Sequence, residues 1–205
     1  THGGAILDSQ HQVHSYNLSI DKKKLLRQRE KQLIGHAAAS LIKDGDTILL
    51  DSGTTTLEVA RNLSPFSDLT IITNSINIAS ELLAYNRFNV IVLGGNVMDS
   101  SRSTVGPIAE SNLKLFYCDK LFLGVDSFSI ENGLSTPDIE EANINQNMMK
   151  RSKEVIAVFD SSKLNRRALA YITSIDSINT IVTDSEMPEE ICNTLSARGI
   201  RVILV

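Results

Sequence analysis

The chain has 205 residues, of which 42% are hydrophobic, and it carries a formal net charge of −4. This length suits one α/β domain, alone or with a small subdomain, and allows a sizeable buried core. The acidic balance argues against direct binding of nucleic acid, because DNA-contacting domains usually carry a basic patch. The sequence shows no signal peptide and no apolar stretch of membrane-spanning length, and its two cysteines, Cys118 and Cys192, lack metal-type spacing. We therefore expect a cytoplasmic protein with no membrane segment, no metal and no cofactor.

The N-terminal part divides into a linker and a helix. Residues 1–20 are mixed and polar, and they predict a linker between domains, which leaves residues 21–205 as the main domain. From Asp21 to about Ile42, apolar residues recur at helical spacing, and Gly45 follows in a turn. The basic residues of this predicted helix lie beside acidic ones, so we interpret them as a solvent-exposed face. They are Lys22, Lys23, Lys24, Arg27, Arg29 and Lys31.

The rest of the chain alternates short Ile/Val/Leu-rich runs with helical patterns. Strands are expected at residues 48–50, 69–73, 89–93, 120–125, 155–159, 168–172, 180–183 and 200–205, and helices at 57–63, 76–85, 107–115, 137–152 and 188–198. This alternation predicts an α/β fold with a largely parallel sheet and helices on both faces. Ligands of such sheets bind at the carboxyl ends of the strands. Polar residues that follow the predicted strands are therefore expected to share one cleft.

The first predicted strand runs into a turn rich in hydroxyl groups. This turn consists of Asp51, Ser52, Gly53, Thr54, Thr55 and Thr56, and a helix follows it. Such a junction can direct backbone N–H groups, hydroxyls and the positive end of a helix dipole at one anion, while the glycine permits close approach. An ordinary helix N-cap is the alternative, but one hydroxyl would satisfy a cap. We therefore favour a site for phosphate or a sugar phosphate.

Two carboxylates and a lysine are further candidates. In the predicted helix that starts at Thr136 as N-cap and Pro137, Glu141 projects into the apolar arc while Glu140 projects away. A carboxylate that points inward needs a hydrogen bond, a cation or a ligand. Asp126 ends another predicted strand, where it could accept a sugar hydroxyl or simply begin a turn. Lys163 could neutralise a phosphate or pair with these carboxylates.

Other polar positions follow the second and third predicted strands. Asn74 and Ser75 follow one of them. Gly94 and Gly95 follow the next, where they allow close backbone approach or form a plain turn. Arg102 lies downstream and is a further candidate for contacting the anion. The chain has neither a Walker-type phosphate loop nor a G-x-G-x-x-G sequence, which disfavours nucleotide binding.

Taken together, these segments resemble the effector-binding domain of the DeoR family of bacterial sugar-metabolism repressors. The matching segments in family order are Thr1–Ala5, Asp51–Thr56, Ile72–Ser75, Leu93–Gly95, Val105–Gly106, Lys120–Asp126, Gly133–Thr136, Glu141–Ala142 and Asp160–Lys163. The resemblance implies a fold shared with ribose-5-phosphate isomerase, glucosamine-6-phosphate deaminase and CoA transferases.

The resemblance also implies a ligand and a mechanism. The effector would be a phosphorylated sugar with its phosphate near Ser52–Thr56, and the rest of the site would be lined by Asn74, Gly94, Gly95, Asp126, Glu141 and Lys163. Residues 137–145 look most like members that control amino-sugar or galactitol/tagatose-type pathways. The family's N-terminal winged helix-turn-helix is absent from these residues, so operator DNA would be bound only through that domain. A homodimer or homotetramer is implied, and the sequence leaves open whether the effector induces or co-represses.

Two other functions compete with this one. Asp126, Glu141 and the segment Asp160–Lys163 resemble acid/base positions of ribose-5-phosphate isomerase, as an active isomerase or deaminase would require. However, that enzyme's Lys- and Gly-rich turn is replaced here by Gly133–Asp138, and no histidine sits where a deaminase would use one for ring opening. We therefore predict that the protein is not an enzyme. The second competitor is an oligomerisation domain with an empty cleft, in which Glu141 and Lys163 form a structural pair.

Overall fold

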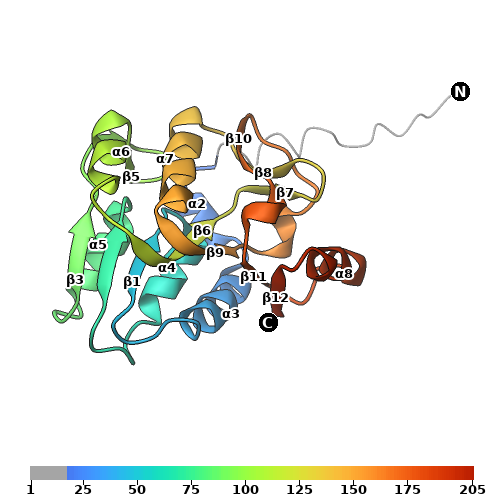
Figure 1. Ribbon diagram of the computed structural model, residues 1–205, viewed down its shortest axis with the longest axis horizontal. Helices are drawn as coiled ribbons and strands as arrows, with labels where there is room; N and C mark the ends of the chain where they lie inside the picture. The colour runs from blue at the N-terminus through green and yellow to red at the C-terminus, as the bar shows by residue number, and fades with distance from the viewer. Residues whose placement is uncertain (1–17) are drawn as a thin grey trace, which may run out of the picture.

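The computed structural model describes residues 18–205, and a sheet of seven strands forms its centre (Figure 1). The strands are β1 (Thr47–Leu50), β2 (Thr70–Thr73), β3 (Asn89–Val92), β6 (Cys118–Gly124), β9 (Ser152–Val158), β11 (Thr180–Thr183) and β12 (Arg201–Leu204). Their order across the sheet is β12-β11-β9-β6-β1-β2-β3, and every neighbouring pair is parallel. The predicted parallel α/β fold is thereby confirmed.

Apolar residues on both faces of this sheet explain why its strands read as nearly continuous hydrophobic runs. Ile48 and Leu50 of β1 join the core under α3 (Gln28–Ala39), α4 (Thr54–Arg61) and α5 (Ile76–Leu83). Leu49 joins the opposite core, under α6 (Pro107–Leu113), α7 (Ile139–Lys150) and α8 (Glu189–Ala197). Each fully buried Leu or Ile contributes about 1.5–3 kcal/mol to stability. The prediction of helices on both faces is confirmed.

Two small antiparallel sheets lie outside the main sheet. One contains β7 (Ser127–Ser129), β8 (Gly133–Thr136) and β10 (Ala170–Thr173), and the other pairs β4 (Asn96–Met98) with β5 (Ser103–Val105). The 3-10 turns η1 (Ser161–Lys163) and η2 (Ile175–Ser177) complete the described elements. Of these strands, the sequence predicted β10 but missed the other four. They are only three or four residues long, and their polar sequences resemble loops, so they show no strand-like apolar run.

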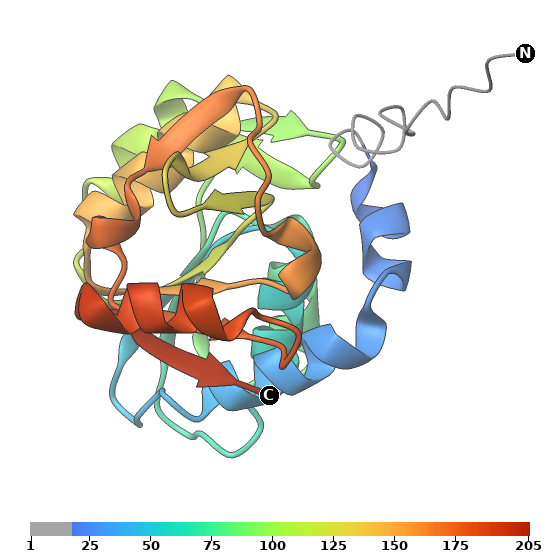
Figure 2. The ribbon, with the colours of Figure 1, turned by 90° about the vertical axis from the view of Figure 1, so that its right-hand side faces the viewer.

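The single helix predicted over 21–42 is wrong. The structure has α2 (Ile20–Leu25) and α3, separated by Leu26 in an extended conformation and Arg27 in the left-handed region with φ of 50°. Apolar spacing suggested continuity, yet Leu26 and Leu33 are 51% and 46% exposed and do not hold the helix to the core. The break lets α2 run along the outside of the molecule beyond α3 (Figure 2). Ile20, the last residue of the predicted linker, begins α2, while residues 1–17 lie outside the described part.

The start of α7 also differs from the prediction. Thr136 belongs to β8, and Asp138 is the N-cap, whose carboxylate accepts from the backbone N–H groups of Glu140 and Glu141 at 2.7 and 3.3 Å. An aspartate supplies both the cap and a favourable charge at the helix N-terminus, which explains why it displaces threonine from that position. The shift leaves the Thr136 hydroxyl available for other partners.

Close packing of α3 on α4 yields the first prediction. A Cβ added to Gly35 would lie 2.6 Å from both the carbonyl carbon and the Cβ of Glu58, so the helices would have to separate. We expect Gly35→Ala to lower the free energy of unfolding by about 1–3 kcal/mol, despite the better helix propensity of alanine. Urea denaturation measures this change. Gly45→Ala is the control, because Gly45 has φ of +89° but open space around it, and it should lose only about 1–2 kcal/mol of backbone strain. A Gly35→Ala variant as stable as the parent would contradict the account.

Candidate functional site

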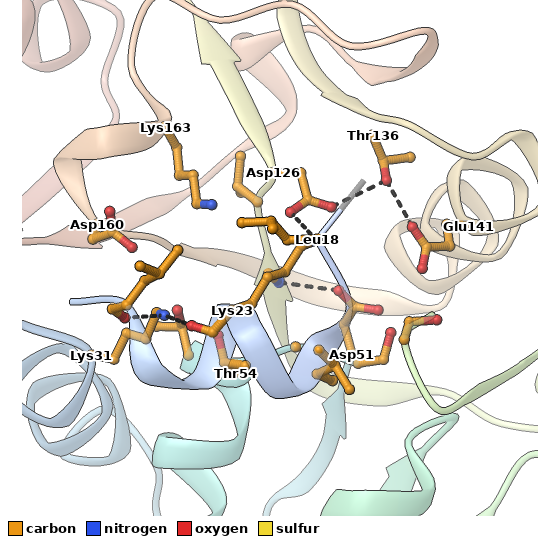
Figure 3. A pocket seen from close by; sticks show the side chains of 18 of the residues that line it. Leu18, Lys23, Lys31, Asp51, Thr54, Asp126, Thr136, Glu141, Asp160 and Lys163 are labelled. Atoms are coloured by element: carbon orange, nitrogen blue, oxygen red, sulfur yellow. Dashed lines mark hydrogen bonds and ion pairs between the residues drawn. The ribbon is translucent and has the colours of Figure 1, made fainter. Parts of the chain in front are cut away.

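A cavity of about 290 Å³ opens at the carboxyl ends of β1, β6 and β9. Residues from widely separated parts of the chain line it, and Figure 3 labels ten of them. Asp51–Thr55 follow β1, Asp126 follows β6, and Asp160 and Lys163 follow β9. Thr136 comes from β8, Glu141 and Asn145 come from α7, and α2 crosses the front. The structure thus brings eight of the predicted site residues together: Asp51, Ser52, Gly53, Thr54, Thr55, Asp126, Glu141 and Lys163.

The N-terminus of α4 forms one wall of the cavity. Gly53 is the N-cap and has no side chain to cap the helix, so the N–H groups of the first turn depend on other partners. Thr54 and Thr55 in that turn line the cavity. Thr56 lies deeper, where its hydroxyl donates to the carbonyl of Gly53 at 3.1 Å. Uncapped N–H groups and the positive helix end make this wall suited to an anion.

Asp51 lies beside that wall and is 3% exposed. One of its carboxylate oxygens accepts from the N–H of Gly124 at 3.2 Å, which ties β1 to β6. Burial raises the pKa of Asp51 well above its usual value, and the neighbouring charge of Glu141 raises it further. Hydrogen bonds from the Ser52 and Gly124 N–H groups lower this pKa and offset part of the rise. A raised pKa favours the neutral carboxyl, which does not repel an anion bound nearby.

Asp126 and Glu141 form the opposite, acidic wall. The Thr136 hydroxyl lies 2.9 Å from Glu141 Oε2 and 3.4 Å from Asp126 Oδ2, so the two carboxylates converge on one point (Figure 3). Burial and the charge of Asp126 raise the pKa of Glu141. Burial would also raise the pKa of Asp126, but the charges of Lys23 and Lys163 outweigh it and hold that pKa below its usual value. These oxygens can accept hydrogen bonds from ligand hydroxyls or amines.

The predicted direction of the residues on α7 agrees with the structure. Glu141 faces the cavity, whereas Glu140 is exposed. One turn further, the buried Asn145 also lines the cavity, and its Oδ1 has no hydrogen-bond partner among the described residues. Asn145 thus places a buried, unpartnered amide oxygen one turn from Glu141.

Lysines of η1, α2 and α3 line the cavity, and the sequence patterns did not predict the two from α2 and α3. Lys163 was expected there, and burial lowers its pKa against the opposing charges of Asp126 and Asp160. Lys23 donates to Asp126 Oδ1 at 2.7 Å. Lys31 is 5% exposed and donates to the carbonyls of Lys23 and Leu26, both at 2.5 Å.

The interpretation of this basic segment as a solvated face is therefore wrong for Lys23, Arg27 and Lys31. Arg27 pairs with Glu186 and donates to the Ser161 hydroxyl at 3.0 Å. Lys23, Arg27 and Lys31 are spaced four residues apart, and this spacing in the sequence could have indicated that they share one face.

The structure places five other candidates outside the cavity, because the β4-β5 hairpin covers the carboxyl ends of β2 and β3. Asn74 donates to the Thr104 carbonyl at 3.3 Å, and Ser75 caps α5. Gly95 has φ of +137°, and a Cβ there would lie 2.6 Å from the carbonyl oxygen of Val105, whereas Gly94 precedes it outside the cavity lining. Arg102 pairs with Asp21 of α2 at 2.7 Å. These contacts are structural, and their polarity alone did not distinguish them from ligand contacts.

Two further properties concern residues 18–205. This part of the chain contains no group of three or more His, Cys, Asp or Glu side chains placed to hold a metal ion. None of its helices combines the length and apolar character needed to cross a bilayer.

The buried ammonium of Lys31 predicts a pH effect. Burial lowers its pKa from 10.5 to about 8, so between these values the folded state binds fewer protons than the unfolded state, and stability rises with pH. Lys31→Met removes this titration. We expect the stability of the parent relative to Lys31→Met to increase by about 1–2 kcal/mol between roughly pH 7.5 and 9.5. Chemical denaturation at both pH values measures it, with the exposed Lys22→Met as control. Parallel pH curves for the parent and Lys31→Met would contradict the burial of a charged lysine.

Comparison with known proteins identifies the family. The model of the DeoR C-terminal sensor domain matches residues 26–185. The chain is 37% identical over 205 residues to the putative aga operon transcriptional repressor of Escherichia coli O157:H7, covering all of this chain and 76% of that protein. It is 33% identical over 205 residues to the HTH-type transcriptional repressor GlcR of Bacillus subtilis (strain 168), covering all of this chain and 77% of that protein.

A solved structure supports the fold. Ribose 5-phosphate isomerase A from Methanocaldococcus jannaschii matches with a TM-score of 0.50 at 18% identity, covering 67% of this chain and 54% of that chain. This likeness concerns the fold alone and confirms the isomerase-like architecture that the resemblance implied. With the family model and both repressors matching along the chain, this protein belongs to the DeoR C-terminal sensor domain family.

Proposed function

We propose that this domain is the sensor of a bacterial repressor of sugar catabolism and that it binds a phosphorylated sugar in the cavity at the carboxyl ends of β1, β6 and β9. The observation that carries the proposal is the pairing of two unlike walls in one cavity. The uncapped N-terminus of α4 suits a phosphate, and Asp126 and Glu141 opposite it suit sugar hydroxyls. Lys23 and Lys163 supply positive charge between the walls.

The acceptors on α7 favour a particular group of sugars. Glu141 and Asn145 both line the cavity, and the buried amide oxygen of Asn145 has no hydrogen-bond partner among the described residues. An ammonium or a set of hydroxyls would satisfy both. We therefore place amino-sugar phosphates and phosphates of the galactitol/tagatose type first among the effectors. The relative from Escherichia coli is named for the aga operon.

Control of DNA binding would be allosteric. The protein would act in the cytoplasm as a homodimer or homotetramer and contact its operator through an N-terminal DNA-binding domain. If the sugar phosphate changes operator affinity by some factor, DNA changes the affinity for the sugar phosphate by the same factor. Either induction or co-repression is compatible with this linkage.

Catalysis is the alternative, since Asp126 and Glu141 could serve as acid and base for an isomerase or deaminase. In this structure Asp126 is engaged by Lys23, and the named relatives are transcriptional repressors. We propose that the sugar phosphate binds to the site and is released without chemical conversion.

Thermal unfolding tests the proposal directly. The probes are glucosamine 6-phosphate, tagatose 6-phosphate and ribose 5-phosphate, each compared with its unphosphorylated parent. A ligand of the folded state raises stability by RT ln(1 + [L]/Kd), about 2.7 kcal/mol at 100 times Kd. We expect a rise in Tm with at least one phosphate, none with its parent, and no product by NMR. Equal shifts by a sugar and its phosphate, or turnover, would refute the sensor proposal in its present form.

A charge placed in the α4 wall provides the matching mutational test. Thr54→Glu brings a carboxylate to the first turn that lines the cavity. Like charges in close contact cost several kcal/mol, so we expect affinity for the phosphorylated sugar to fall by more than about a hundredfold with the fold unchanged. Calorimetric titration measures the affinity. Thr194→Glu, the same exchange on α8 away from the cavity, is the control. Undiminished affinity in Thr54→Glu would remove this wall from the site.

A further inference from the structure

Helix α2 lies across the cavity but is weakly attached to the rest of the domain. Ile20, Lys23, Leu26 and Arg27, from the helix and the turn after it, line the cavity. Of the six residues of α2, Ile20 is the one that is buried, and Leu25 is 78% exposed. The apolar contact that normally holds a helix to a domain is therefore small here. Polar contacts must supply much of its attachment.

Four such contacts are present along the helix, one of which is the bond from the buried Lys31 ammonium to the Lys23 carbonyl. The Ile20 N–H donates to the Ser100 carbonyl at 2.9 Å. Asp21 pairs with Arg102 at 2.7 Å, where both side chains are about half exposed. Lys23 Nζ pairs with Asp126 at 2.7 Å inside the cavity, where each side chain is only about a quarter exposed. Among the side chains of α2, Lys23 is thus the one whose ion pair reaches the interior of the site.

The charges of the cavity determine what Lys23 would do when an anion enters. Asp126 already places a negative charge there, with Asp160 and Glu141 nearby. An anion at the α4 wall adds to this charge, and withdrawal of Lys23 would leave Asp126 and the anion facing each other. An ammonium with three donors can instead contact Asp126 and the anion together. Figure 3 shows α2 in the required place, passing above Thr54 with Asp126 beyond it.

We propose that Lys23 is a direct ligand of the bound anion and that this contact fastens α2 over the occupied cavity. The inference rests on the proposed function for the presence of an anion, but it adds a binding residue and a moving part. Because α2 is the first helix of the described residues, its position sets the path by which the chain enters the domain. Occupancy of the cavity is thereby coupled to the segment that precedes α2.

Hydrogen exchange of the Ile20 amide tests this inference, since that amide reports whether α2 is docked on Ser100. The probe is inorganic phosphate, with chloride at equal ionic strength as the reference. In the parent, saturating phosphate is expected to slow Ile20 exchange by about five- to tenfold. In Lys23→Gln, Ile20 should exchange faster without phosphate, and phosphate should have no effect.

Two variants separate this role from a general effect of charge or folding. Lys22→Gln changes the same charge one residue away on an exposed position, and it should behave like the parent. Lys23→Arg keeps a cation of similar reach and should recover most of the protection by phosphate. An unchanged melting temperature for Lys23→Gln would show that the domain remains folded.

Either of two results would overturn the inference. One is protection of Ile20 by phosphate in Lys23→Gln equal to that in the parent. The other is no effect of phosphate on Ile20 in the parent. Both are distinguishable from failure of the proposed function, which would appear as the absence of stabilisation by any phosphorylated sugar in the thermal measurement.

Discussion

Parallel pairing of β1 with β6 is the constraint on which the site depends. Leu50 of β1 pairs in register with Phe122 of β6, so the carboxyl ends of these two strands lie side by side. The residues that follow them, Asp51 and Asp126, therefore line one cavity. The hydrogen bond from the Gly124 N–H to Asp51 fixes the distance between them. A slip of one residue in this register would turn every side chain of the strand to the other face and disperse the site.

The cavity holds charges of both signs, and their balance explains how it tolerates burial. The charges of Lys23 and Lys163 lower the pKa of Asp126, whereas burial raises the pKa values of Asp51 and Glu141. The interior can thus present cations to a phosphate and oxygen acceptors to a sugar, because lysines and carboxylates line the same cavity. The ion pair between Lys23 and Asp126 is central to this arrangement, because it links the cavity to α2.

Sequence patterns predicted the parallel sheet, the helices on both faces and eight of the residues that line the cavity. They succeeded where one local signal sufficed, as for the hydroxyl-rich turn Ser52–Thr55 after β1 and the inward direction of Glu141. They failed where long-range contacts decide. The left-handed conformation of Arg27 depends on partners such as Glu186, which lies 159 positions away in the chain. Asn74 and Gly95 were grouped with the site because they follow strands, but the β4-β5 hairpin covers those strand ends.

A crystal structure of the domain with the phosphorylated sugar that most raises its melting temperature tests the central claim most directly. The account predicts the phosphate within hydrogen-bond distance of the Thr54 and Thr55 backbone N–H groups, and the sugar hydroxyls facing Asp126 and Glu141. A second cavity, lined by Arg61 and Arg102 among others, lies on the other side of α2. A phosphate bound there, with the cavity at β1, β6 and β9 empty, would contradict the account.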